Sequence, residues 1–280
     1  MDLQLIALDP QLVAYCLLLG AALGFLAGLL GIGGGMLMVP FMMQILANKG
    51  IATDYLVKVA VATSLTTILF TSLSSVRAHH RAGGVRWDLV ALLTPGIILG
   101  ALFGAQLVGF APARWLELSF GVFLLFTSMT MLKAKKPLAE GAVPKTLPAR
   151  GALFGVGTLI GVISAMVGAG GGFLTVPYLS NRGVSMKNAV ATSAACGVPI
   201  ALGGALGYIW AGRNLNLAPF TLGYLYLPGL LLISLASVLT APIGARIAHR
   251  TDTVQLRKYF AMLLLTLAAY MVWHSLWHSI

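Results

Sequence analysis

Apolar residues form long runs in this chain, and short polar segments separate the runs. Stretches without a charged residue cover 10–48, 59–76, 89–113, 118–132, 151–181, 188–212, 214–245 and 259–280. A helix needs about 20 apolar residues to cross a bilayer, so the pattern predicts eight hydrophobic segments, three of them unusually long. Because backbone polar groups inside a bilayer must hydrogen-bond within the protein, we expect these segments to be helices.

Two glycine-rich stretches interrupt two of the long segments at equivalent places. The first reads GFLAGLLGIGGGMLMVPF over residues 24–41, and the second reads GVISAMVGAGGGFLTVPY over residues 161–178. Glycine inside a helix costs about 1 kcal/mol relative to alanine, so each triplet predicts a broken helix, supported by the proline that follows. Gly20, Gly24 and Gly28 instead form a small-residue face that favours close helix packing. The predicted break residues are Gly33, Gly34, Gly35 and Pro40, and Gly170, Gly171, Gly172 and Pro177.

The similarity between the two halves extends beyond the glycines and predicts an internal duplication. The sequence KVAVATSL at 58–65 matches KNAVATSA at 187–194, and further matches link 101–124 with 241–264. The expected units are a first transmembrane repeat over 1–132, a linker over 133–149 and a second transmembrane repeat over 150–280.

Composition restricts the chain to the membrane-protein class. Charged residues make up 9% of the chain and the mean hydropathy is +0.93, whereas soluble domains contain about 25% charged residues. The net charge of +11 does not indicate nucleic-acid binding, because the basic residues gather in short loops beside the segments. The segments contain no nucleophile–base pair or metal-ligand cluster, so we expect neither an enzyme nor a cofactor. Cys16 and Cys196 lie in apolar runs and are expected to be buried thiols.

The charge distribution also predicts the topology. Basic loops at 77–86, 133–150 and 246–258 are expected to be cytoplasmic. Three segments lie between the second and third loops, and three single crossings would put these two loops on opposite sides of the membrane. Both loops are cytoplasmic only if segment 151–181 enters the membrane and returns as a hairpin. We therefore predict an all-α polytopic protein of the cell (inner) membrane with two inverted repeats. Each repeat is a glycine-broken helical hairpin plus three further transmembrane helices, and both termini are external.

The broken helices suggest a site for a small anionic substrate. A half-helix that starts at a glycine break presents free N–H groups and the positive end of its dipole, which together attract anions without a charged side chain. Tight packing of the glycines and back-bonding of the hydroxyls to the helix are the alternatives. The candidate binding residues are Gly33, Gly34, Gly35, Gly170, Gly171, Gly172, Thr63, Ser64, Thr192 and Ser193.

Two matched lysines stand at the edges of the next segments. Lys58 and Lys187 either attract anions at the two mouths of the pathway or extend toward lipid headgroups. All seven carboxylates lie at termini, loops or segment edges, so the sequence does not identify a coupling group. A facilitated carrier, coupling at an edge carboxylate and co-transport on the substrate all stay open, as do an anion channel and a non-transporting scaffold. The sequence does not indicate an oligomeric state.

The motifs resemble those of a known family. The repeats GLLGIGGG…VP and VGAGGG…VP, the AVATS steps, and LTAPIGARIAHR followed by LRKYFAMLLL are similar to the sulfite exporter TauE/SafE family, also called the 4-toluenesulfonate uptake permease family. The resemblance covers nearly the whole chain. It implies transport of sulfur-containing or organic anions such as sulfite, thiosulfate, sulfoacetate or sulfonates, and a non-sulfur organic acid is the alternative substrate.

Overall fold

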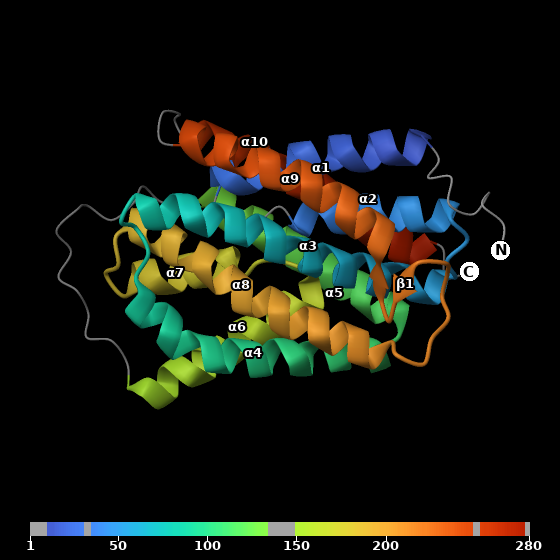
Figure 1. Cartoon of the computed structure of the whole chain (residues 1–280), viewed down its shortest axis with the longest axis horizontal. Helices are drawn as coiled ribbons and strands as arrows, with labels where there is room; N and C mark the ends of the chain where they lie inside the picture. Colours follow the sequence, from blue (N-terminus) through green and yellow to red (C-terminus); the bar gives the residue numbers. More distant parts are fainter. Residues whose placement is uncertain (1–9, 31–34, 134–148, 249–252, 278–280) are drawn as a thin grey trace.

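A computed structural model describes residues 10–30, 35–133, 149–248 and 253–277. In these ranges the chain forms ten α-helices and one short β-hairpin (Figure 1). Seven of the helices are long and apolar enough to cross a membrane, which confirms an all-α polytopic membrane protein. The elements are α1 (Pro10–Leu30), α2 (Gly35–Asn48), α3 (Thr53–Arg81), α4 (Trp87–Phe110), α5 (Ala113–Lys133), α6 (Arg150–Val167), α7 (Gly172–Asn181), α8 (Met186–Ala211), β1 (Thr221–Leu222), β2 (Leu225–Tyr226), α9 (Leu227–Ala248) and α10 (Thr253–Trp277).

Both glycine-rich segments are divided into two helices. The second break is the better described, because Gly168 ends α6 with φ +67° and Gly171 precedes α7 with φ +72°. Only glycine adopts this left-handed conformation without a steric cost, so the local sequence causes the break. In the first stretch α2 starts at Gly35, while Gly33 and Gly34 lie outside the described residues.

The prolines lie inside the half-helices. Pro40 falls in the second turn of α2 and Pro177 in the second turn of α7. A proline lacks the N–H that would bond to the carbonyl four residues earlier. Each proline therefore leaves one carbonyl in the first turn without its helical donor.

The limits of two other segments differ from those expected from the charge-free runs. Helix α3 extends from Thr53 to Arg81 and takes in charged residues at both ends, because a charge ends the lipid-facing surface of a helix and does not end the helix itself. Residues 214–245 are not one helix. A loop and the β1–β2 hairpin precede α9, at a sequence that contains Pro219 and Gly223.

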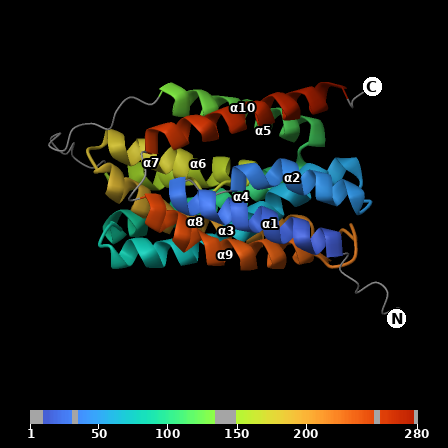
Figure 2. The ribbon, with the colours of Figure 1, turned by 90° about the horizontal axis from the view of Figure 1, so that it is seen from above.

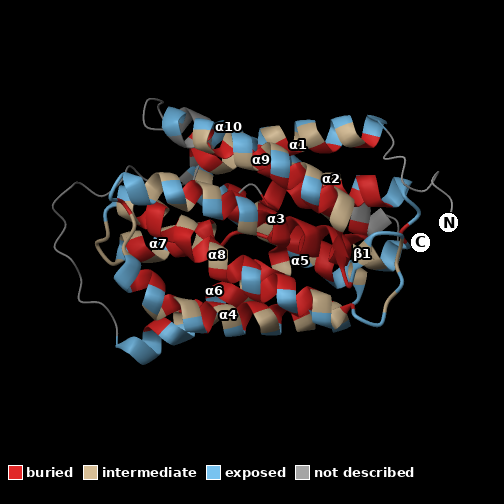
Figure 3. Ribbon diagram, in the orientation of Figure 1, coloured by how far each residue is buried: buried red, intermediate tan, exposed pale blue. Residues whose placement is uncertain are grey.

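The main helix contacts join a helix of one half of the chain to a helix of the other half. Helix α1 packs against α9 and α4 packs against α6, while α3 pairs with α8 and α5 with α10. Figure 2 shows α5 and α10 side by side along one face. Figure 3 shows the buried residues concentrated where α3 and α8 run through the middle of the bundle. The outer helices expose large apolar side chains, as expected of surfaces in lipid.

Glycines make the exchanged contacts possible. A side chain on Gly24 of α1 would collide with Ser237 of α9, and one on Gly161 of α6 would collide with the backbone of Ile97 in α4. The two contacts join equivalent positions of the two halves. Gly20 meets Ile233 in the same way, so Gly20 and Gly24 have the expected packing role, whereas Gly28 lines a cavity. These matched contacts support the duplication.

The chain connections divide into two ends. Figure 1 shows the α3–α4 and α7–α8 connections at one end, together with the last residues of α5 and α9. The described parts of the three basic loops lie at this end, which we call the basic end. The α2–α3, α4–α5 and α8–α9 connections lie at the other end. The α1–α2 hairpin opens toward this other end and the α6–α7 hairpin opens toward the basic end (Figures 1 and 2).

Two glycines of α6 provide a test of the packing. A Cβ on Gly161 would meet the backbone of α4, whereas a Cβ on Gly155 has open space around it. Gly161→Ala is expected to destabilise the protein by about 1–3 kcal/mol through overpacking, seen as a lower melting temperature in detergent. Gly155→Ala, with the same gain in helix propensity, is expected to melt no lower than the parent. Equal melting of the two variants would contradict this packing.

Candidate functional site

The two glycine breaks meet at one serine of α3. The hydroxyl oxygen of Ser64 lies 2.9 Å from the carbonyl oxygen of Gly35 and 3.1 Å from that of Gly168, so its single proton is shared between the start of α2 and the end of α6. A side chain on Gly35 would collide with the Gly168 carbonyl. The backbones of the two breaks are therefore in direct contact in the centre of the bundle.

The matched serine of α8 has a different environment. Ser193 is 1% exposed, and its hydroxyl has no hydrogen-bond partner among the described residues. The hydroxyls of Ser164 in α6 and Thr175 in α7, on either side of the second break, are also buried without a partner in the described structure. A buried polar group without a partner costs about 1–3 kcal/mol. Three such groups around one break favour a polar occupant there.

The matched threonines bind backbone N–H groups of the opposite half. Thr63 accepts the N–H of Tyr226 at 3.0 Å, and Thr192 accepts the N–H of Arg86 at 3.1 Å. Tyr226 directly precedes α9 and Arg86 directly precedes α4, so the two contacts are equivalent. Each threonine thus holds the start of the fourth helix of the other half. Back-bonding to the same helix occurs instead at Thr66.

The matched lysines also differ. Lys58 is buried, and its Nζ donates to the carbonyl of Gly109 at 2.9 Å in the last turn of α4. A positive charge there interacts favourably with the negative end of the helix dipole. Lys187 is exposed near the basic end. The alternative of extension toward headgroups therefore fits Lys187, whereas Lys58 contacts the end of a helix inside the protein.

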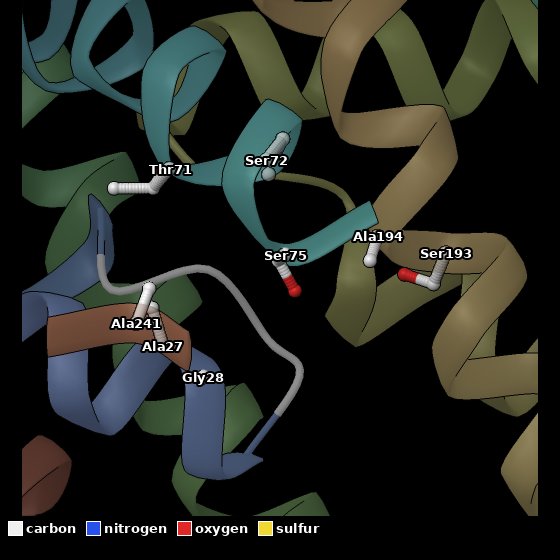
Figure 4. A pocket seen from close by; sticks show the side chains of 9 residues that line it. Ala27, Gly28, Thr71, Ser72, Ser75, Ser193, Ala194 and Ala241 are labelled. Atoms are coloured by element: carbon white, nitrogen blue, oxygen red, sulfur yellow. The ribbon is translucent and has the colours of Figure 1, made fainter. Parts of the chain in front are cut away.

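Two small cavities adjoin the breaks. Figure 4 shows the first, where the hydroxyls of Ser75 and Ser193 point into the space between α3 and α8. Its lining combines both halves of the chain and contains no charged side chain. The lining residues are Ala27, Gly28, Thr71, Ser72, Ser75, Gly170, Ser193, Ala194 and Ala241. The second cavity is lined by Leu23, Gly24, Ala27, Gly35, Met38, Ser64, Thr67, Ile68, Thr71, Ile233 and Ser237.

The cavities are too small for a sulfur oxyanion. The space open to the centre of a water molecule is about 20 Å³ in the first and about 10 Å³ in the second. One water needs about 10–15 Å³ on this measure. The two linings share Ala27 and Thr71, so they lie next to each other along α1 and α3. Passage of an anion would require these helices to separate.

A row of hydroxyls on α3 is the feature that the sequence analysis missed. Ser64, Thr67, Thr71 and Ser75 recur every three or four residues, which places them on one helix face. All four line the cavities, and they extend from the breaks toward the basic end. The sequence signal was available, because eight hydroxyl residues fall within 63–75 of an apolar segment. The equivalent face of α8 carries Cys196, Ile200 and Gly204 and lacks this row.

The threonine contacts can be tested with an isosteric pair of variants. Thr63→Val leaves the N–H of Tyr226 buried without its acceptor, which should cost about 1–3 kcal/mol of stability. Thr66→Val is the control, because the Thr66 hydroxyl donates only to Ala62 of its own helix. Thermal unfolding in detergent should show a lower midpoint for Thr63→Val alone. A loss of the same size in both variants would show that the contact with Tyr226 is unimportant.

Comparisons with known proteins agree with this architecture. The family model described as "Sulfite exporter TauE/SafE" matches residues 16–271. A "Probable membrane transporter protein" of Haemophilus influenzae is 34% identical, and the alignment covers 91% of this chain and 96% of the relative. A similarly named protein of Methanocaldococcus jannaschii is 27% identical, with 97% and 98% of the two chains covered. No solved structure matches the chain.

These names indicate transport and not catalysis, in agreement with the spans of the structure. The family match includes both glycine breaks, the α3 and α8 segments and the exchanged helix pairs. By the extent of that match and by its similarity to a full-length relative, the chain is a membrane transporter of the sulfite exporter TauE/SafE family.

Proposed function

We propose that this protein carries small sulfur-containing or organic anions across the cell (inner) membrane by alternating access around the two glycine breaks. The observation that supports this most directly is the contact of the breaks at Ser64, next to cavities lined with hydroxyls and without charge. Sulfite, thiosulfate, sulfoacetate and sulfonates share oxygens that accept several hydrogen bonds. Neutral donors in a site of this kind bind such oxygens without holding them by an ion pair.

The donors would come from two sources. The first N–H groups of α2 at Gly35 and of α7 at Gly172 have no acceptor within their own helices, and the dipoles of both helices are positive there. The hydroxyls of Ser193, Ser164 and Thr175 supply further donors that have no partner in the described structure. Gly170 and Gly171 belong to the same proposed site, where the absence of side chains lets an anion approach the backbone. Gly33 and Gly34 are assigned to it from the sequence repeat alone.

The proposed mechanism uses the duplicated architecture. The hairpins open toward opposite ends and the first helix of each half packs on the other half, as in transporters built from inverted repeats. Rocking of one half against the other would widen the α1–α3 side or its counterpart between α6 and α8. We further propose that the basic end and the linker 133–149 are cytoplasmic and that both termini are external.

Substrate class is best tested by ligand binding to the purified protein. The panel contains sulfite, thiosulfate, sulfate, sulfoacetate and simple carboxylates. We expect the sulfur oxyanions to raise the melting temperature of the protein more than the carboxylates do. Ser193→Ala should lower the affinity for the anion that stabilises the protein by about tenfold or more, since a hydrogen bond to a charged group contributes about 1.5–3 kcal/mol. Thr127→Val in α5 is the control, because it also removes a buried hydroxyl without a described partner, away from the cavities.

The same panel separates the alternatives. Stabilisation by carboxylates alone would identify an organic-acid transporter. In vesicles, saturable flux that is accelerated by substrate on the opposite side is expected of a carrier. Flux that rises linearly without counter-exchange would identify an anion channel and contradict alternating access.

Cysteine labelling tests the topology. Lys49 and Asn181 are exposed and lie at opposite ends of the bundle, in the α2–α3 connection and at the end of α7. The native thiols Cys16 and Cys196 are buried, so they should stay unlabelled. A membrane-impermeant maleimide applied to intact cells should label Lys49→Cys and spare Asn181→Cys. Labelling of both from one side would contradict the proposed inverted repeats.

A further inference from the structure

A larger hollow than the two cavities lies on the outside of the bundle. It runs between α3 and α9 near the basic end and has a volume of about 740 Å³. We call it the α3–α9 groove. Its lining residues are Phe70, Leu73, Ser74, Arg77, Ala78, His79, Arg81, Val238, Pro242 and Arg246. It shares no lining residue with the two cavities at the breaks.

One part of the groove is apolar and faces outward. Phe70 and Leu73 are 39% and 52% exposed. Both belong to α3, which is apolar and long enough to cross a membrane. On α9 the apolar lining is Val238 and Pro242, and the same helix exposes Leu235, Leu239 and Ile243. In a bilayer such side chains contact acyl chains, so this part of the groove is open to lipid.

The other part of the groove is strongly basic. Arg77 and Arg81 are one turn apart at the end of α3, and Arg246 lies in the last turn of α9. None of the three forms an ion pair with a described residue, and the described lining contains no carboxylate. The neighbouring Arg86 is different, because it pairs with Asp88 at 2.6 Å.

The arginines have a simpler explanation, which is weaker. Each one lies near a helix C-terminus, where a positive charge is favourable, and basic residues accumulate at cytoplasmic ends. These effects account for each arginine singly. They do not require that arginines from two different helices line one hollow whose other half is apolar and open to the bilayer.

We propose that the α3–α9 groove binds one anionic phospholipid. Its phosphate would lie at Arg77, Arg81 and Arg246, because guanidinium groups bind phosphate oxygens with paired N–H donors. An acyl chain would follow Phe70, Leu73, Val238 and Pro242 toward the bilayer centre. Basic pockets between transmembrane helices on the cytoplasmic side are recognised sites for acidic lipid headgroups.

Native mass spectrometry of the full chain in detergent tests the site directly. With phosphatidylglycerol added, the spectrum should contain an adduct of one lipid, and phosphatidylcholine with the same acyl chains should be retained at least tenfold less. The variant Arg77→Gln/Arg81→Gln/Arg246→Gln should lose this preference. Arg114→Gln/Arg213→Gln/Lys187→Gln is the control with the same loss of charge outside the groove, and it should keep the preference.

Two further measurements distinguish a lipid from a free anion. Leu73→Ala should lower lipid retention while the preference for the acidic headgroup persists. Glycerol phosphate or inorganic phosphate in excess should not displace the lipid. Displacement by either soluble anion, equal retention of the two lipids, or loss of the preference in the control variant would overturn the proposal. These readouts do not depend on transport, so the result stands apart from that of the substrate panel.

Discussion

The contact between the two glycine breaks is the constraint on which the rest of the structure depends. Two helix ends face each other in the interior, and Ser64 donates its one proton to carbonyls of both. A side chain at Gly35 would force the breaks apart. The close approach therefore needs glycine at the breaks and a small hydroxyl residue on α3. It also brings α3 to the centre of the bundle, where its hydroxyl face borders both cavities.

A bilayer allows interrupted helices only where other protein groups surround the freed backbone. The exchanged pairs α1–α9 and α4–α6 provide these surroundings, because their glycines let each half enclose the hairpin of the other. Thr63 and Thr192 then tie the starts of α9 and α4 to the central helices. The breaks, the small-residue faces and the threonines thus form one arrangement. A loss of any of them would expose polar backbone to an apolar environment.

The two halves share a backbone plan but have different side chains at matched positions. The threonine contacts are equivalent, whereas Ser64 is bonded to both breaks and Ser193 has no described partner. Lys58 is buried against a helix end and Lys187 is exposed. Of the two matched helices α3 and α8, α3 alone carries the row of hydroxyls between the breaks and the basic end. In our proposal, duplication supplies the site at the centre, and these differences make its two approaches unequal.

The sequence alone determined the features that depend on local chemistry. Apolar length predicted the spans, the glycine triplets predicted the breaks, and the matched motifs predicted which elements of the two halves correspond. It also singled out Thr63, Ser64, Thr192 and Ser193 as candidate binding residues, and of these Ser64 bonds to both breaks. It did not find the hydroxyl row on α3, although the spacing was present, and it did not separate the roles of the two lysines.

Only the tertiary structure decided what these groups contact. Ser64 bonds to residues 29 and 104 positions away in the chain, and Thr63 bonds to one 163 positions away. Such contacts follow from the exchange of helix partners between halves. Periodicity records which face of a helix is apolar or small, but many pairings satisfy the same pattern. Particular glycines select one pairing, because they let the backbones of two helices come into contact. Those contacts exist only once both halves are packed together.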